Sequence, residues 1–411
     1  VNSQYALSQV SAFAGCEYEV GNSSRVTIAV IDTGISGTHP DLTGKLTNTL
    51  SKAFTTDGVA TQSANNPPTA ACNHATRVAG VAAASTDNGA QVAGMSWGAQ
   101  LLSLKVFADA SCLAVGCTDA GCLTNDVAIS SAIYHAISLQ NTAAVGKVVI
   151  NMSLGGAGPC AAAEQTAITN AAAAGIPVVV AAGNDGGAVN NPGNCAGAIP
   201  VGATDANNSI ASFSSRGAEL ASNGLVAPGV AVLTTDLGGG TANATGTSFS
   251  APMVSGLAAL ILSAKPTFTA AQVSAAIRGG TDNIGVASYG GTRAGTLGDT
   301  AGAGRMDAYR AMRLAIKGTL AGFDGEVKPI DFPNPFKPSQ TGSVAFAIPP
   351  GLQGAATSIK IYTLDGTPVR TVTGLSWDGK NTEGGAVASG TYIFVVTTSA
   401  GTGRGRLSVL R

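Results

Sequence analysis

The first three-quarters of this sequence alternates short apolar runs with longer segments of helical period. The runs Val26–Ile31, Lys147–Leu154 and Ile176–Ala181 are rich in Val, Ile and Ala. Strands of this kind are buried on both faces and occur in parallel sheets covered by helices. Helices are predicted at Asp126–Leu139, Ala161–Ala174, Ser250–Ser263, Ala270–Arg278 and Arg305–Ile316. The alternation therefore predicts an α/β domain with a mostly parallel sheet.

The pattern changes after Lys317. A stretch rich in Gly, Pro and Phe without helical period follows, and it indicates a linker at 318–331 between a domain at 1–317 and one at 332–411. Beyond the linker, short segments alternate apolar with polar residues: Ser343–Ile348, Ser358–Leu364, Val369–Thr373, Thr391–Thr398 and Arg406–Leu410. Turns such as Asp365-Gly366 separate them. This spacing predicts a small all-β, Ig-like sandwich.

Charge is scarce along the whole chain. Only 11% of the 411 residues are Asp, Glu, Lys or Arg, the net charge is −1, and no block of Lys or Arg occurs. We therefore expect no nucleic-acid partner and no electrostatic membrane patch. The longest apolar stretches, such as Val254–Leu262, are too short to span a bilayer, so no transmembrane segment is expected.

Seven cysteines lie in the first half of the chain: Cys16, Cys72, Cys112, Cys117, Cys122, Cys160 and Cys195. Their spacing lacks the CxxC pairs of a zinc site, so disulfides formed in an oxidising compartment are the favoured interpretation. Because seven is odd, at least one thiol is free or pairs with another chain. The alternative is a cytosolic protein with buried free cysteines. No leader begins the sequence at Val1, so we expect either a cytoplasmic chain or a secreted one whose leader has been removed.

Three histidines limit the choice of a general base. His135 lies within a helical segment, and His39 follows a turn and precedes Pro40. His74 stands where a loop enters a helix of small residues, so its side chain is expected to face a cleft. His74 is therefore the candidate base.

Asp32 and Ser248 are the candidate partners of that base. Asp32 ends an apolar strand, and α/β proteins place their sites at the carboxyl ends of such strands. A carboxylate there can accept the distal N–H of a histidine ring. Ser248 opens an apolar helix, whose unpaired N–H groups and dipole favour the oxyanion of an attacked carbonyl. Ser250 competes as the helix N-cap, and Ser248 itself has the alternative role of a cap.

Asn184 ends a further strand, in the sequence Ala181-Ala182-Gly183-Asn184. Its side-chain amide is a candidate second donor to the oxyanion. The loss of one such donor costs about 10²–10³ in rate in a serine protease from which it has been removed.

With these residues in this order, the chain resembles the subtilisin-like serine proteases, or subtilases, of the peptidase S8 family. The resemblance extends from about Val1 to Ile316 and rests on seven motifs in the family's order. They are IDTGISGTHPDL around Asp32, HATRVAG from His74, NMSLGG at 151–156, AAGN ending at Asn184, FSSRG at 213–217, APG at 227–229 and GTSFSAP around Ser248.

The resemblance implies a subtilisin-like three-layer α/β fold and a secreted or cell-surface serine endopeptidase. Asp32, His74 and Ser248 would be its catalytic triad, acting on polypeptides through an acyl-enzyme on Ser248. One wall of the substrate cleft would be formed by Ser153, Leu154, Gly155 and Gly156, paired with an extended peptide. An apolar pocket for the residue before the scissile bond would be lined by Ala181, Ala182 and Gly183, next to Asn184.

Two positions depart from the family's pattern. The usual HGTHVAG is here His74-Ala75-Thr76-Arg77, and Met253 stands where a His usually follows the Pro of the serine motif. Met253 is most simply core packing. A buried Arg77 needs a partner, or else the cleft beside His74 is altered. The alternative function is therefore a structural or surface-assembly protein on a subtilase scaffold, with weak or no proteolysis.

The resemblance also implies structural calcium and one disulfide. Asp41 matches a family calcium ligand, and Asn88 is a partner for it, since mixed oxygen ligands suit Ca²⁺. The alternative for Asp41 is a turn-capping role. Cys160 and Cys195 fall where some extracellular subtilases have a bridge. The pairing of the remaining cysteines stays open; one of Cys112, Cys117 and Cys122 could reach Cys72 or Cys16.

The C-terminal segment resembles FlgD-type Ig-like modules. The resemblance rests on FPNPFKP at 332–338, Trp377-Asp378-Gly379 and ASGTY at 388–392. Such modules imply a role in secretion, surface attachment or self-assembly, by analogy of fold alone.

Overall fold

The computed structural model describes residues 4–16, 18–19, 21, 26–47, 49–54, 60–61, 72–86, 88–108, 111–112, 122–282, 301–320, 330–332, 334–348, 358–363, 365–399 and 401–411. Its contacts divide the chain into two compact units, one of the described residues up to Thr319 and one of those from Leu320 onward. Most of the predicted linker, 318–331, lies outside the described residues.

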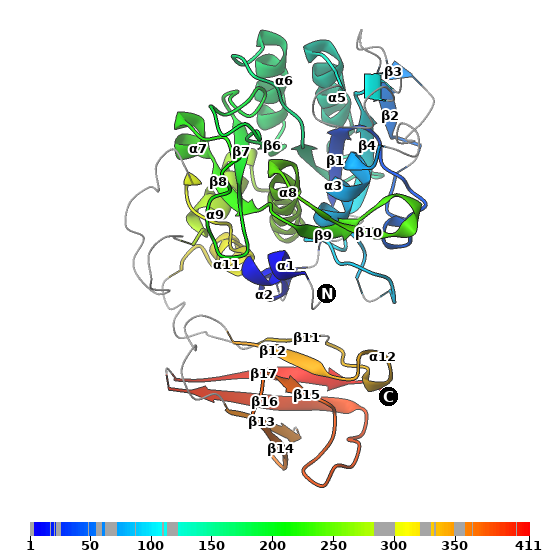
Figure 1. Ribbon diagram of the computed structural model, residues 1–411, viewed down its shortest axis with the longest axis vertical. Helices are drawn as coiled ribbons and strands as arrows, with labels where there is room; N and C mark the ends of the chain where they lie inside the picture. The colour runs from blue at the N-terminus through cyan, green and yellow to red at the C-terminus, as the bar shows by residue number, and fades with distance from the viewer. Residues whose placement is uncertain are drawn as a thin grey trace. The chain divides into compact units, whose positions relative to one another are not determined.

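The first unit is built on an eight-stranded sheet in the order β3-β2-β4-β1-β5-β6-β7-β8 (Figure 1). Seven strands from β2 to β8 run parallel, and β3 pairs antiparallel with β2. The strands are β1 Val26–Asp32, β2 Lys52–Phe54, β3 Ala60–Thr61, β4 Gln100–Lys105, β5 Lys147–Met152, β6 Val178–Ala181, β7 Ala198–Thr204 and β8 Leu225–Pro228. The predicted α/β fold with a mostly parallel sheet is confirmed.

Helices cover both faces of this sheet, as the side chains of β1 make clear. Ile28 and Val30 pack in one apolar cluster with α3, α8, α9 and α11, while Ala29 and Ile31 pack in another with α5 and α6. Alternate residues of a strand point to opposite faces, so these two clusters are the two interfaces of a three-layer fold. The helices are α1 Tyr5–Gln9, α2 Ala12–Cys16, α3 His74–Ala83, α5 Asp126–Leu139, α6 Ala162–Ala173, α7 Ala218–Asn223, α8 Thr247–Ala264, α9 Ala270–Gly279 and α11 Ala308–Lys317.

Helix α8 is the central helix of this unit. It is long and apolar enough to cross a membrane by length and composition, but 89% of its apolar window is buried inside the protein. Its hydropathy therefore reflects its position in the core. The helix begins three residues earlier than the predicted Ser250, at Thr247 after Gly246.

A short hairpin and two single-turn 3-10 helices complete the first unit. The hairpin consists of β9 Val232–Thr235 and β10 Thr241–Ala244, with η2 Leu237–Gly239 between its strands. The other 3-10 turn, η1 Pro40–Leu42, lies shortly after β1.

The second unit contains two antiparallel sheets, as predicted. One has the order β11-β12-β15 and the other β14-β13-β16-β17. Buried Phe336, Phe346, Trp377 and Phe394 belong to one apolar cluster among the described residues of this unit. Its elements are β11 Ile330–Phe332, α12 Pro338–Thr341, β12 Val344–Ala347, β13 Ser358–Thr363, β14 Pro368–Val372, β15 Ser376–Trp377, β16 Gly390–Thr398 and β17 Gly401–Val409.

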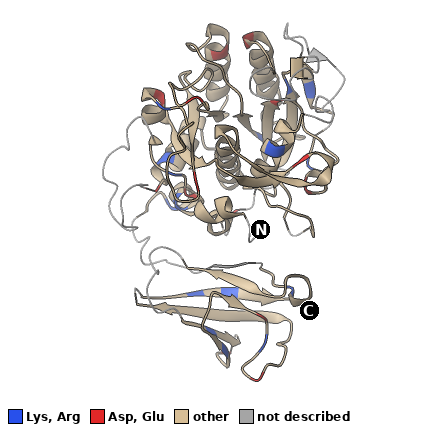
Figure 2. Ribbon diagram, in the orientation of Figure 1, with Lys and Arg blue, Asp and Glu red and all other residues tan. Residues whose placement is uncertain are grey.

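Charged residues are scattered thinly over the described residues of both units. Figure 2 shows Lys and Arg as separate short segments, with no continuous basic stripe along any of the drawn elements.

Candidate active site

Asp32 and His74 meet at the carboxyl end of the sheet. Asp32 is the last residue of β1 and is buried, and His74 is the first residue of α3. The Nδ1 atom of His74 lies 2.9 Å from Oδ1 and 3.0 Å from Oδ2 of Asp32. Because a carboxylate only accepts, Nδ1 carries the proton and donates it in this bond. Nε2 is then the unprotonated, basic nitrogen of the neutral ring.

The turn after β1 fixes both partners. The Thr33 N–H donates to Asp32 Oδ1 at 2.7 Å, and the Thr33 hydroxyl accepts the Ala75 N–H at 3.2 Å. One residue therefore holds the carboxylate and also satisfies an N–H in the first turn of α3, which has no partner within the helix.

The other two histidines are occupied elsewhere. His39 is buried; its Nδ1 accepts the Asp41 N–H at 3.0 Å, and its Nε2 donates to Gly240 O at 2.8 Å. His135 donates from Nε2 to Leu50 O, and burial lowers its pKa. Of the three, His74 is the one whose side chain lines the cleft that contains Ser248.

Ser248 is the second residue of α8. Gly246 precedes the helix at φ +146°, a conformation that L side chains rarely adopt, and this turn presents Ser248 to the cleft. The Ser248 hydroxyl donates to Ser153 O at 3.3 Å. The side chain of Ser248 is close to buried, since 9% of the residue is exposed.

Because α8 begins at Thr247, Pro252 lies in its second turn. A helix that began at Ser250 would have placed this proline in the first turn. A proline there has no N–H to donate to the carbonyl four residues back, which is that of Ser248. The Ser153 hydroxyl donates to this carbonyl instead, at 2.7 Å. The serine on the cleft wall therefore replaces the helical hydrogen bond that the proline removes.

A buried polar chain continues from this contact into the core. Ser255 donates to Asn151 Oδ1 at 2.8 Å, and Asn151 Nδ2 donates to the Ser153 hydroxyl at 3.1 Å. The sequence alone did not single out Asn151 or Ser255 as functional, although Asn151 is the first residue of the NMSLGG motif. The chain connects β5 to the first turns of α8 and fixes Ser153 beside Ser248.

Ser250 does not compete with Ser248 for the cleft. Its hydroxyl is buried and donates to Ala227 O at 3.0 Å and Pro228 O at 3.2 Å. The N-cap is Gly246, so neither serine caps α8.

Asn184 lies beside the start of α8 with its amide orientation set by Thr247. Its Oδ1 accepts the Thr247 N–H at 2.8 Å and the Thr247 hydroxyl at 2.9 Å. With the oxygen occupied, Nδ2 is the end of the amide that can donate to a group in the cleft, which Asn184 lines together with Ser248. The sequence motif pointed to Asn184 but not to the threonine that orients it.

The cleft has a volume of about 700 Å³. The predicted wall residues line it (Ser153, Leu154, Gly155 and Gly156), as do Ala181 and Gly183 of the predicted pocket. Ala182, the residue after β6, does not: it packs with Val189, Leu220 and Val226.

Three acids, Asp126, Glu164 and Asp185, also line this cleft, while the apolar character of the pocket at 181–183 stays a prediction. Hydrogen bonds, chiefly from the Ser215 hydroxyl, lower the pKa of the exposed Asp185.

Glu164 is a buried acid of α6 that sequence reasoning did not single out. Its Oε2 accepts Asn191 Nδ2 at 2.5 Å, while its buried Oε1 has no hydrogen-bond partner among the described residues. Burial raises the pKa of this carboxyl, and the Asn191 bond opposes the rise. Asn191 in turn pairs through its backbone with Gly156, at 2.9 and 3.0 Å. Glu164 therefore supports the Gly156 wall of the cleft.

Asp41 and Asn88, the candidate calcium ligands, do lie together. Asp41 is fully buried, and its carboxylate accepts N–H groups from Asn88 Nδ2 at 3.0 Å, Gln91 N at 3.2 Å and Val92 N at 3.0 Å. Within the described part of the chain these partners are all uncharged. Asp41 offers a buried carboxylate of the kind that Ca²⁺ binds. Asn88, however, turns its Nδ2 toward Asp41 while its Oδ1 accepts the Ala90 N–H at 3.1 Å, so its amide would have to turn to supply an oxygen ligand.

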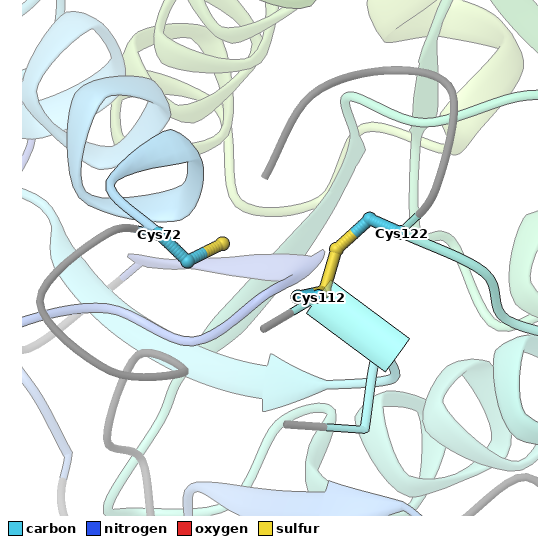
Figure 3. Close-up of side chains that lie close together, drawn as sticks. All are labelled: Cys72, Cys112 and Cys122. Atoms are coloured by element: carbon cyan, nitrogen blue, oxygen red, sulfur yellow. A yellow bond between two sulfur atoms is a disulfide. The ribbon is translucent and has the colours of Figure 1, made fainter. Parts of the chain in front are cut away.

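The cysteines form two disulfides among the described residues. Cys160–Cys195, the pair expected from the family resemblance, is confirmed, and Cys112 pairs with Cys122 within one loop. Figure 3 shows Cys72 beside this second bridge; the three sulfur atoms lie within 4.8 Å of one another. Cys72 is itself disulfide-bonded, and Cys117 lies outside the described residues. Cys16 is the free thiol that the odd count required, and it is buried.

The two departures from the family's motifs have structural counterparts. Met253 is buried in the core cluster of α8, which confirms the packing interpretation. Arg77 forms an ion pair with Asp236, at the end of β9, so it has the partner that the sequence required. Phe249 packs beside the His74 ring, with ring centroids 5.7 Å apart. The residues around His74 are thus packed and paired.

Comparisons with known proteins agree with this geometry. A model of the Subtilase family matches residues 23–292. Subtilisin DY from Bacillus licheniformis is 36% identical over 273 residues, covering 65% of this chain and 87% of that protein. Subtilisin Savinase from Lederbergia lenta is 37% identical over 251 residues, covering 61% of this chain and 81% of that protein.

A solved protease structure from Pseudoalteromonas arctica matches with a TM-score of 0.59 and 26% identity, covering 74% of this chain and 94% of that one. The family match spans more than half of the chain, and the fold and the arrangement at the carboxyl end of β1 fit it. The chain therefore belongs to the subtilase family and is a serine endopeptidase.

Proposed function

We propose that Ser248 is the nucleophile, His74 the general base and Asp32 the residue that orients His74. The contact that carries this assignment is the pair of 2.9 and 3.0 Å distances from His74 Nδ1 to the Asp32 carboxylate. That contact leaves the basic Nε2 to take a proton in the cleft that Ser248 lines.

In the reaction, Nε2 of His74 takes the hydroxyl proton of Ser248 while Oγ attacks the scissile carbonyl carbon. The tetrahedral intermediate collapses, the C–N bond breaks, and the same proton passes to the leaving amine. Water then attacks the acyl-enzyme, His74 takes a proton from it, and Ser248 regains its hydroxyl as the acid product leaves. Asp32 stays ionised and stabilises the imidazolium at each stage.

The oxyanion is stabilised by two N–H donors in this proposal. One is the backbone N–H of Ser248, in the first turn of α8, where N–H groups lack helical partners. The other is Nδ2 of Asn184, whose Oδ1 is already held by Thr247.

The substrate is an extended polypeptide in the cleft. Leu154 and Gly155 would provide main-chain partners for an added strand, and Gly155 is exposed there. Gly156 supports this wall through its own backbone pairing with Asn191. The cleft is lined by residues of α5, α6 and β6 and by the segment that follows β5, so it would contact several substrate residues.

Labelling with a serine-directed fluorophosphonate tests the assignment. The wild-type chain should label on Ser248, and Ser248→Ala should abolish labelling and peptide hydrolysis. The matched control is Ser250→Ala, since Ser250 lies two residues further along the same helix with its hydroxyl bound to backbone carbonyls. A folded wild-type chain that does not label, or that labels equally after Ser248→Ala, would overturn the proposal.

We also propose that Asp41 and Asn88 hold a structural Ca²⁺. The ion would supply positive charge to a buried carboxylate and tie the loop at 88–92 to η1. Thermal unfolding of the Ser248→Ala chain with Ca²⁺ and with EDTA tests this, because a ligand of the folded state raises Tm. Asp41→Asn should remove the difference. Equal Tm values with Ca²⁺ and EDTA would refute the site.

The chain is proposed to act outside the cell, with its second unit an FlgD-type Ig-like module that mediates surface attachment or self-assembly. The two disulfides support an oxidising compartment. Alkylation of protein taken directly from its source cells, without reductant, should leave Cys160 and Cys195 unmodified. Modification of both in folded protein would contradict an extracellular location.

A further inference from the structure

The first turn of α3, which carries His74, faces an acidic residue on a separate element. Asp236 follows β9 and caps η2, accepting the Leu237 N–H at 2.9 Å. Its two carboxylate oxygens accept two bonds from one guanidinium: Arg77 Nε to Oδ1 at 3.1 Å and Arg77 Nη2 to Oδ2 at 2.7 Å. This is the fork geometry that fixes orientation as well as distance.

Asn73, immediately before His74, joins the same carboxylate. Its side chain makes no cap bond to its own helix. Although burial raises the pKa of Asp236, hydrogen bonds from Arg77 and the Leu237 N–H, together with one from Asn73, leave it below its ordinary value. Asp236 is therefore ionised and contacts α3 on both sides of His74, through residues 73 and 77.

The strand before Asp236 fastens the next part of the helix. The Thr234 hydroxyl donates to Arg77 O at 2.6 Å, and the Thr235 hydroxyl donates to Thr76 O at 2.7 Å. The two elements approach so closely that a Cβ at Gly80 would lie 2.1 Å from the Thr235 hydroxyl oxygen. The β9 end of the hairpin is therefore packed against α3 with little room for movement.

The turn of the hairpin is attached as well. His39 Nε2 donates to Gly240 O at 2.8 Å, and Gln91 Nε2 donates to Gly239 O at 3.1 Å. The turn that contains Asp236 is thus held by His39 and Gln91, and Asp236 lies between this support and the helix that carries His74.

We propose that Asp236 and Arg77 form a positioning clamp for His74, which holds the first turn of α3 so that the imidazole stays aligned between Asp32 and Ser248. The clamp rests on the proposed role of His74 as general base. Neither residue is proposed to touch substrate. Both are positioning residues that act through the helix backbone.

A contribution to folding stability alone does not explain the Arg77–Asp236 ion pair. Arg77 and Asp236 retain 24% and 21% of their side-chain exposure, and ion pairs that water reaches contribute about 0–1 kcal/mol. A small displacement of a catalytic group costs far more, since about 1 Å of misplacement can lower a rate by about 10². The pair therefore matters for rate through geometry.

The test compares Arg77→Leu, Asp236→Asn and the double variant, using a soluble peptide amide. Each single variant should lower kcat by about tenfold or more while KM stays within about twofold, because only the alignment of the base changes. The double variant should be no slower than the slower single variant, since both changes break one contact. Asp378→Asn, which removes the 3.7 Å partner of Arg370 in the second unit, is the control and should keep wild-type kcat.

Conservative variants keep the test decisive if a truncation fails to fold. Asp236→Glu keeps the carboxylate and should retain more kcat than Asp236→Asn. Arg77→Lys keeps the charge but loses the fork, and should be slower than wild type. Wild-type kcat in folded single variants, a rise in KM at unchanged kcat, or losses that multiply in the double variant would overturn the clamp. Failure of the wild-type chain to label with fluorophosphonate would instead overturn the proposed function.

Discussion

Lys45 offers a quantitative test of how this protein handles a buried charge. The residue follows η1, is 6% exposed, and donates from its ammonium to Trp97 O. Burial lowers the pKa of Lys45 from 10.5 to about 8. Below pH 8 the ammonium is charged in both states, so the folded state bears the whole desolvation penalty. Between pH 8 and 10.5 the unfolded state binds more protons, so stability rises with pH.

The size of the effect follows from the shift. A change of one pKa unit corresponds to about 1.4 kcal/mol, so the penalty at pH 7 is roughly 3 kcal/mol. Lys45→Met removes it while keeping a similar apolar stem, but loses the bond to Trp97 O, which contributes about 1–2 kcal/mol. The variant should therefore be about 1–2 kcal/mol more stable than the parent at pH 7. At pH 10.5 it should be less stable by about the same amount.

Urea unfolding at pH 7 and pH 10.5 measures the difference. Both chains carry Ser248→Ala to prevent self-digestion, and Lys317→Met, at the exposed end of α11, is the control for loss of a lysine charge. A Lys45→Met change in unfolding free energy that is the same at both pH values would refute the reasoning, because it would show that no buried ammonium is being titrated.

Three further predictions concern the site and the cysteines. Thr247→Val removes one of the two bonds that hold Asn184, so kcat for a peptide amide should fall by about tenfold, the equivalent of about 1.4 kcal/mol, at similar KM; an unchanged kcat would argue against that orientation. Replacing Cys160 and Cys195 by Ser opens a bridge with a sequence separation of 35, so chain entropy predicts a loss of about 4 kcal/mol in denaturant unfolding; a change below about 1 kcal/mol would contradict it. Burial raises the pKa of the Cys16 thiol, so iodoacetamide should leave it unmodified in native protein and modify it after unfolding; rapid native labelling would show that the thiol is accessible.

The layers of the fold could be predicted because each depends on a local pattern. The apolar run ending at Asp32 is a buried strand in any parallel sheet, and the small residues after His74 form a helix that packs closely. Gly246 marks the turn into α8. The carboxyl ends of parallel strands and the starts of the helices that follow them lie at one edge of the sheet. These sequence patterns therefore predicted that Asp32, His74 and Ser248 lie in one region.

What could not be predicted depends on pairs that are far apart in sequence. From the sequence alone, Glu164 is an ordinary helical residue. Its role depends on its contact with Asn191, which lies 27 residues further along the chain. The partner of Arg77 lies 159 residues away. The role of Ser153 depends on Pro252, which lies in another element, α8. The start of α8 was predicted too late because a proline is normally a first-turn residue. Ala182 was assigned to the pocket because the AAGN motif was taken as a whole. Side chains of successive residues in extended backbone point to opposite sides, so neighbours such as Ala181 and Ala182 need not line the same cleft.

The sparse charge of the described surface has a consequence for how substrate arrives. Three acids line the cleft and would attract only a cationic substrate, so encounter with an uncharged peptide is governed by diffusion and by the fit of the peptide. Salt shortens the Debye length from about 10 Å at 0.1 M to about 3 Å at 1 M, but here there is little attraction for it to screen. Hydration rests instead on the neutral polar groups of Ser, Thr and Asn. The rate at which an uncharged peptide is captured should therefore be nearly independent of ionic strength, from dilute buffer to brine.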